Sequence, residues 1–211
     1  NSYSNQTTTI ATVSSYNIYG LFVDLNNTLY CSIFSGHQVV KKWLNSNSST
    51  MTTVAGTGSS GSASNMLHGP YGIFVDTNFD LYVADQLNNR IQLFRLGQIN
   101  GITVAGNTSP NLTISLNQPT NVILDGNKYL FITDENHRII GSDENGFRCI
   151  VACSMSSGST SDKLSSPRSI AFDSFGNLFV VDYYNYRIQK FRLSTNFCNS
   201  KTTNNDSIFF I

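Results

Sequence analysis

Short apolar runs rich in β-branched and aromatic residues alternate with turns of Gly, Asn and Asp along most of the chain. Runs of this length and composition are typical of β-strands. No segment shows a sustained period of 3.6 residues, so the pattern predicts an all-β protein. The clearest stretch lies between residues 69 and 106, where we expect four strands within Gly69–Asp76, Asp80–Asp85, Asn88–Phe94 and Ile102–Gly106.

Versions of this stretch recur along the chain. The Asp that ends the first strand stands at positions 24, 76, 125 and 173, and a Leu follows it five residues later each time. Units of about 50 residues with four strands each are typical of β-propeller blades. The sequence therefore predicts a single β-propeller domain over residues 1–211, with four four-stranded blades at residues 17–56, 69–106, 118–153 and 166–192.

The strands are apolar on both faces, as in Ile73-Phe74-Val75. A sheet with one face in water would alternate cleanly, whereas a propeller blade lies between two neighbours and buries both faces. The fourth unit shows three clear strands, and residues 8–13 resemble the last strands of the other units. We expect residues 8–13 to pair with residues 187–192 and close the ring; the alternative is an arc of a larger propeller.

Three parts of the repeated pattern stand out: Pro70-Tyr71-Gly72-Ile73, the segment 176–182 and the segment 185–189. In these parts the chain resembles the NHL-repeat family over most of its length. The first unit departs from the pattern, with Ile33 in place of the second-strand Asp and Gln38 in place of the Arg. The resemblance implies a β-propeller, most often six-bladed, and members that range from extracellular sensor domains to partner-binding modules of ubiquitin ligases.

Composition narrows the function classes. Charged residues make up 12% of the 211 residues and the net charge is zero, whereas a nucleic-acid-binding domain usually carries a basic excess. We therefore expect no nucleic-acid partner. No apolar run approaches the length of a membrane span. The chain begins at Asn1 without a signal-peptide pattern, so we expect a mature chain or an excised piece.

Low Lys content and a surface rich in Ser, Thr and Asn favour an extracellular location. The chain has as many glycosylation sequons as its composition predicts by chance, so they permit glycosylation without indicating it. We expect a secreted glycoprotein or the ectodomain of a larger membrane protein. The sequons lie at Asn5, Asn26, Asn47, Asn107, Asn111 and Asn205.

An Asp at the end of the second strand recurs with an Arg in the following turn. These residues could form a ring of carboxylates around a cation, or each Asp could pair with the Arg of its own blade. Because the first unit lacks both partners together, we predict structural pairs. The pairs are Asp85 with Arg90, Asp134 with Arg138, and Asp182 with Arg187.

The sequence contains no complete catalytic or metal-ligand constellation. One branch of the family that the chain resembles, the α-amidating lyases, is enzymatic and uses zinc held by several His. This chain has three histidines, His37, His68 and His137, and we expect the blades to hold two of them well apart. We predict no catalytic residues, no bound metal and no cofactor. The rival interpretation is a propeller hydrolase or lyase with a metal-dependent site in the central channel.

The loops at one end of the propeller supply the best binding candidates. Exposed Tyr side chains beside amides suit recognition of a protein, a peptide or a glycan, although Tyr in such loops can equally pack between neighbours. We predict a non-catalytic interaction module. Its candidate binding residues are His68, Tyr71, Gln86, Asn88, Arg168, Tyr183 and Tyr184.

Cys149 and Cys153 are candidates for a local disulfide. Four residues in a straight strand span roughly 13 Å, so the bond requires the chain to curl back after Val151, which the following Ser-Met-Ser-Ser-Gly run permits. Paired cysteines in this strand end resemble those of some extracellular NHL proteins. We expect Cys31 and Cys198 to be free or paired outside the chain.

Overall fold

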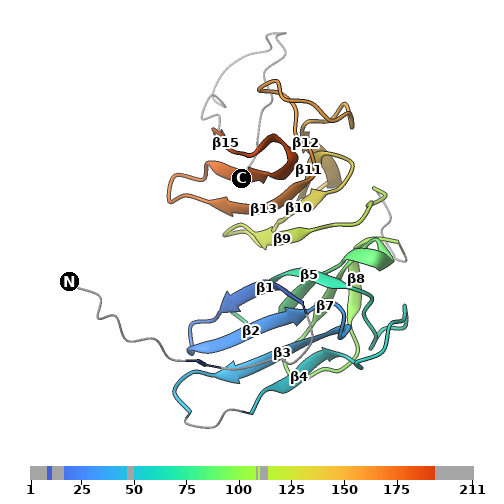
Figure 1. The fold of residues 1–211 in the computed structure, drawn as a ribbon, viewed down its shortest axis with the longest axis vertical. Coiled ribbons are helices and arrows are strands. Elements are labelled where there is room, and N and C mark those ends of the chain that lie inside the picture. Colours follow the sequence, from blue (N-terminus) through green and yellow to red (C-terminus); the bar gives the residue numbers. More distant parts are fainter. Residues whose placement is uncertain (1–8, 11–16, 47–49, 108, 110–113, 193–211) are drawn as a thin grey trace, which may run out of the picture.

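The protein is all-β, as the sequence predicts, and its strands form four antiparallel sheets arranged as propeller blades (Figure 1). The computed structural model describes residues 9–10, 17–46, 50–107, 109 and 114–192. Blade 1 contains β1 (Ile18–Val23), β2 (Thr28–Ile33), β3 (Gln38–Trp43) and β4 (Thr52–Gly56). Blade 2 contains β5 (Pro70–Val75), β6 (Leu81–Asp85), β7 (Arg90–Phe94) and β8 (Ile102–Gly106).

The other two blades follow in chain order. Blade 3 contains β9 (Asn121–Leu124), β10 (Leu130–Asp134), β11 (Arg138–Asp143) and β12 (Gly146–Val151). Blade 4 contains β13 (Pro167–Phe172), β14 (Leu178–Asp182) and β15 (Arg187–Phe191). Two short 3-10 turns, η1 (Gln86–Asn88) and η2 (Tyr183–Asn185), join the second and third strands of blades 2 and 4.

An Asp side chain fixes the turn between the first two strands of each blade. In blade 2 the Oδ1 of Asp76 accepts hydrogen bonds from the backbone N–H groups of Asn78 at 2.8 Å and Asp80 at 3.0 Å. Asp24, Asp125 and Asp173 make the same pair of contacts in their own turns. Asp suits this position because its short carboxylate reaches backbone donors two and four residues ahead.

The three Asp–Arg pairs are present, and their carboxylates are buried. Arg90 Nε donates to Asp85 Oδ2 at 2.7 Å, and the corresponding N–O distances are 3.4 Å for Asp134–Arg138 and 2.8 Å for Asp182–Arg187. All three carboxylates are fully buried. Arg90 also donates to the carbonyl oxygens of Ser62, Ala63 and Met66. Each pair therefore ties the turn after the second strand to the loop that enters its own blade.

The surroundings of Asp85 show why the buried carboxylate of each pair needs several hydrogen-bond partners. Burial raises the pKa of the Asp85 carboxyl, and hydrogen bonds from the His68 backbone N–H, the Asn88 amide and Arg90 act in the opposite direction. The first two of these bonds measure 2.7 and 2.8 Å. A buried carboxylate is tolerated when its oxygens are satisfied in this way.

We predict that Arg90→Ala lowers the free energy of unfolding by about 3 kcal/mol, because it leaves Asp85 buried without its cation. Arg187→Ala should cost less, since the Arg187 side chain is 29% exposed and water can replace it. Chemical denaturation of both variants measures the difference. Equal losses in the two variants would contradict the role assigned to burial.

Successive blades pack face to face through apolar side chains. Phe22 of blade 1 contacts Phe74 of blade 2 with ring centroids 5.1 Å apart, and Phe131 of blade 3 contacts Phe172 of blade 4 at 4.9 Å. In each of the first three blades, the second residue of the third strand faces the following blade. At this position Val39, Ile91 and Ile139 are completely buried.

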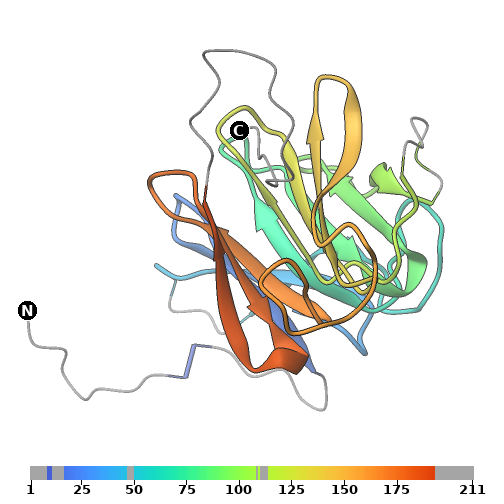
Figure 2. The same ribbon diagram turned by 90° about the horizontal axis from the view of Figure 1, so that it is seen from above.

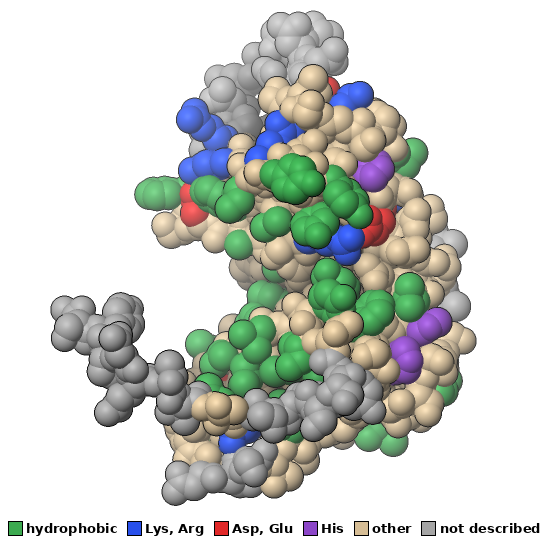
Figure 3. Space-filling view, viewed as in Figure 1, with side chains coloured by type: hydrophobic (Ala, Val, Ile, Leu, Met, Phe, Trp, Pro, Cys, Tyr) green, Lys and Arg blue, Asp and Glu red, His purple; other side chains and the backbone are tan. Residues whose placement is uncertain are grey.

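The four blades form an open arc rather than a closed ring. A gap separates blade 1 from blade 4, and the molecule has the outline of a letter C (Figures 1 and 3). Among the described strands β15 pairs with β14 alone, so it lies at the edge of a three-stranded sheet (Figure 2, red strand). Ile188, which corresponds to Ile91 in the repeat, is 70% exposed.

Among the described residues, the predicted closure by residues 8–13 is not seen. Residue 8 and residues 11–13 lie outside the described residues, while Thr9 and Ile10 are exposed and belong to no strand.

A matched pair of substitutions tests the open arc. Ile91→Ala should cost about 3 kcal/mol because it leaves a cavity between two blades. Ile188→Ala, at the same repeat position, should change the free energy of unfolding by about 0.5 kcal/mol or less. If both substitutions cost the same, a segment covers the free face of blade 4 and the ring is closed in solution.

Candidate functional site

Two repeat positions from the four blades meet at one end of the central channel. The residue that follows the second strand is Phe34, Gln86, Glu135 or Tyr183, in blades 1 to 4. The second residue of the first strand contributes Tyr19, Tyr71 and Arg168 from blades 1, 2 and 4. With Gln118 these side chains line one hollow of about 470 Å³, which we call the four-blade cleft. A hollow of this size is within the range of small-ligand sites.

The local backbone explains why these side chains converge. Gln86 and Tyr183 are the first residues of η1 and η2, directly after the buried carboxylates of Asp85 and Asp182. The hydrogen bonds of each Asp hold the turn, and the left-handed residue Asn89 (φ 56°) returns the chain into the third strand. This turn therefore directs the side chain of the residue after the Asp into the four-blade cleft.

A ladder of stacked groups crosses the four-blade cleft. Tyr19 stacks on Tyr71 with centroids 4.4 Å apart. The Arg168 guanidinium lies over the rings of Tyr71 and Tyr183, at 5.6 and 5.2 Å from their centroids. Cations in this position are attracted by the ring quadrupole. The ladder therefore links blade 4 to blades 1 and 2.

Blade 3 adds a carboxylate to this ladder. Glu135 Oε1 lies 3.2 Å from Arg168 Nη1, and its Oε2 accepts a 2.6 Å hydrogen bond from the Ser166 hydroxyl. Arg168 Nη1 also donates to the Tyr71 hydroxyl at 3.4 Å. Burial raises the pKa of Tyr71 and the neighbouring Arg168 opposes this effect, so Tyr71 remains a neutral phenol.

Two polar groups in the cleft keep unused hydrogen-bonding capacity. Gln86 is 5% exposed, and its side-chain amide makes no hydrogen bond to the described part of the chain. Arg168 Nε is buried and has no partner there either. The Gln86 amide is available to a bound molecule, whereas Arg168 Nε is enclosed by the protein.

Comparison with known families now identifies the repeat. A family model described as NHL repeat matches residues 164–191, which contain β13, β14 and β15. The chain carries an NHL repeat. The match confirms the resemblance seen in the sequence, and the other three blades share the register of this NHL blade. No curated protein matches the sequence.

Solved propeller structures resemble the arc at low sequence identity. A protein of unknown function from Bacteroides thetaiotaomicron superposes with a TM-score of 0.70 and 14% identity, over 87% of this chain and 50% of its own. A gluconolactonase from Xanthomonas campestris gives a TM-score of 0.63 and 14% identity, over 83% and 58%. A virginiamycin B lyase from Staphylococcus aureus gives 0.53 and 12%, over 87% and 59%.

At these identities the likeness shows the fold alone. The NHL-bearing arc spans half to three-fifths of the length of these three structures.

The structure divides the seven binding candidates. Tyr71, Gln86, Arg168 and Tyr183 line the four-blade cleft, and Tyr184 packs against Tyr183 with centroids 5.0 Å apart. The other two candidates lie elsewhere. Asn88 holds its own turn through the Gly61 carbonyl and Asp85, and His68 packs against His37 at 5.4 Å.

Half of the cleft was missed by the sequence interpretation. Tyr19, Phe34, Gln118 and Glu135 line it and were not among the candidates. The NHL register contained the signal for three of them, because Tyr19 aligns with Tyr71, and Phe34 and Glu135 align with Gln86 and Tyr183. Gln118 precedes Pro119 and has no comparable signal.

Two of the histidines act as links between blades. His37 Nδ1 accepts a hydrogen bond from the Gly69 backbone N–H at 3.2 Å, and His137 Nδ1 accepts one from Ser166 at 3.1 Å. In blade 2 the Asn89 side chain does the same for the Gln118 N–H at 2.8 Å. Among the described residues, no group of three or more His, Cys, Asp or Glu side chains is placed to hold a metal ion.

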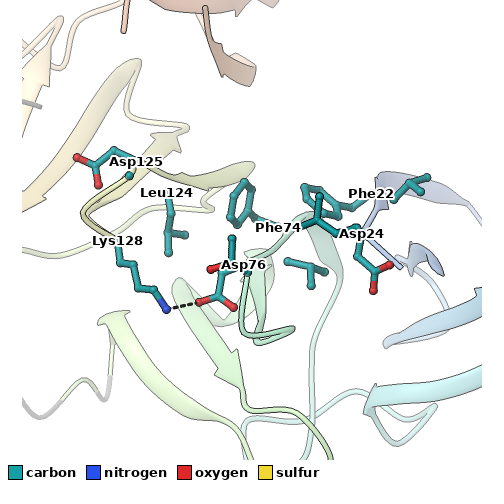
Figure 4. A pocket seen from close by; sticks show the side chains of 12 residues that line it. Phe22, Asp24, Phe74, Asp76, Leu124, Asp125 and Lys128 are labelled. Atoms are coloured by element: carbon teal, nitrogen blue, oxygen red, sulfur yellow. Dashed lines mark hydrogen bonds and ion pairs between the residues drawn. The ribbon is translucent and has the colours of Figure 1, made fainter. Parts of the chain in front are cut away.

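The opposite end of the channel has a different character (Figure 4). A pocket of about 260 Å³ there has an apolar floor that includes Phe22, Phe74 and Leu124. Lys128 pairs with Asp76 across two blades at 2.9 Å. The Asp side chains at this end cap their own turns, and the Oδ2 of Asp125 is buried without a partner among the described residues.

The link made by His37 predicts a pH dependence. Burial lowers the pKa of His37 and the neighbouring His68 lowers it further, while Asp85 opposes both. The unfolded chain therefore takes up a proton that folded His37 resists. Stability should fall as the pH drops through about 6.5 and level off below the folded pKa.

His37→Asn should reduce this pH dependence, because Asn89 makes the equivalent link without a titrating ring. Melting temperatures of both proteins between about pH 7.5 and about pH 5 measure the effect. An identical loss on acidification in the two proteins would show that His37 does not carry it.

Proposed function

We propose that this protein is a non-catalytic binding module and that its ligand, a protein, a peptide or a glycan, occupies the four-blade cleft. One observation carries the proposal: the Gln86 side-chain amide has no hydrogen-bond partner among the described residues and lies in the cleft beside half-exposed aromatic rings. Aromatic surfaces with a few fixed polar groups are the usual composition of recognition sites.

Two features support an extracellular location for this module. Cys149 and Cys153 form a disulfide with their Cα atoms 5.6 Å apart, and disulfides persist mainly in oxidising compartments. The sequon residues Asn26 and Asn107 are exposed, which agrees with this location without indicating it. Cys31 is a free, buried thiol, whereas Cys198 lies outside the described residues. No helix in the described ranges is long and apolar enough to cross a membrane.

The enzymatic alternative rests on likeness to other propellers. Two of the similar structures are described as a lyase and a gluconolactonase, at 12% and 14% identity. A metal-dependent hydrolase or lyase would need an ion in the central channel. We expect less than about 0.1 equivalent of zinc or calcium in purified protein by elemental analysis. A stoichiometric ion resistant to dialysis would favour the enzyme.

A matched pair of tyrosines tests the binding proposal. Tyr183 lines the four-blade cleft, whereas Tyr186, three residues later, is 94% exposed and makes no contribution to it. We screen the intact protein against glycan and peptide arrays and repeat every positive with both variants. Tyr183→Ala should weaken binding about tenfold, and Tyr186→Ala should change it less than about twofold.

Melting temperatures of both variants should stay near that of the parent protein, since both rings are at least half exposed. Ligands that bind equally well to the two variants would place recognition outside the four-blade cleft and overturn the proposal.

A further inference from the structure

We infer that the ligand of the four-blade cleft is an uncharged carbohydrate. The inference rests on the proposed function and narrows it to one ligand class. It draws on the charge balance of the cleft, on its free hydrogen-bonding groups and on the exposure of its rings.

The cleft has no net charge to offer a ligand. Among the described residues that line it, Arg168 and Glu135 alone are charged at neutral pH, and they neutralise each other at 3.2 Å. Both carboxylate oxygens of Glu135 are engaged, by Arg168 and by the Ser166 hydroxyl. An anionic ligand would meet Glu135, and a cationic ligand would meet Arg168. Either would disturb the existing pair, whereas a neutral ligand would leave it intact.

The free hydrogen-bonding groups match hydroxyl groups. The side-chain amide of Gln86 presents a donor and an acceptor in one plane, and it has no partner among the described residues. Adjacent sugar hydroxyls present a donor and an acceptor in the same way. A molecule that lacks groups complementary to this amide would displace its water without replacing the hydrogen bonds, so the amide favours ligands that carry hydroxyl groups.

The aromatic rings provide apolar surface at both ends of the ladder. Tyr71 is already engaged, since it stacks on Tyr19 and the Arg168 guanidinium lies over its ring. Tyr19 and Tyr183 are 48% and 51% exposed, so each keeps ring surface for a ligand. The C–H face of a sugar ring is flat and apolar, and it can cover such a surface while its hydroxyls reach the amide.

The test uses an array of oligosaccharides in three groups: neutral, sialylated and sulfated. We expect the parent protein to bind neutral members at least about fivefold more tightly than their charged analogues. Glu135→Gln removes the negative charge and leaves Arg168 unbalanced. The affinity of this variant for sialylated or sulfated members should rise at least about fivefold. Tyr183→Ala should lose binding to all members of the array, and Tyr186→Ala should lose binding to none.

The outcomes separate the inference from the proposed function. Suppose that a peptide binds and that its binding depends on Tyr183 and not on Tyr186. This result would support the proposed binding module and contradict the inference that its ligand is a carbohydrate. If the parent protein binds charged glycans more tightly than neutral ones, the inference that the ligand is uncharged is wrong. Absence of any ligand that distinguishes the two tyrosine variants would overturn both.

Discussion

A carboxylate buried at the end of the second strand organises each complete blade. It accepts a backbone N–H from the loop that enters the blade and a guanidinium from the turn that leaves the second strand, as Asp85 does with His68 and Arg90. Such a group costs free energy to bury and is stable only with all its partners. Blade 1 shows the alternative solution. Ile33 and Gln38 replace the charged pair there, and Ile33 is completely buried in an apolar cluster.

This fixed framework leaves neighbouring positions free to vary. The residue after the buried carboxylate is Gln86, Glu135 or Tyr183. In η1 and η2 it closes the turn through its backbone carbonyl, which any side chain allows. The fold brings one such residue from each blade to the same end of the channel. A repeat protein can therefore keep its blades constant and change its ligand through a few side chains, which agrees with the mixed chemistry of the four-blade cleft.

The sequence predicted what depends on local chemistry. Strand positions, Asp-capped turns, the three buried pairs and the Cys149–Cys153 disulfide all follow from short-range patterns, and the structure contains them. The arrangement of blades was harder to predict. The angle between blades depends on packing of side chains such as Phe22 and Phe74, so the open arc could not be read from the repeat count.

The candidate site was predicted in part for a similar reason. Tyr71 and Tyr183 stand out as loop aromatics, whereas Tyr19 and Phe34 look like ordinary strand residues of a degenerate first unit. Their place in the four-blade cleft becomes visible only when the four units are superposed and their equivalent positions are seen to converge. His37 and His137 illustrate the converse, because residues typical of metal or catalytic sites serve here as hydrogen-bond acceptors between blades.

The central claim is that non-adjacent blades meet in one cleft. Arg168 of blade 4 and Tyr71 of blade 2 are 97 residues apart in sequence and in contact in the structure. A double-mutant cycle on the free energy of unfolding, with Arg168→Met and Tyr71→Leu alone and together, measures their interaction directly. The account predicts a coupling energy of about 1 kcal/mol. Effects that add to within about 0.3 kcal/mol would show that the ladder does not form and would contradict the cleft.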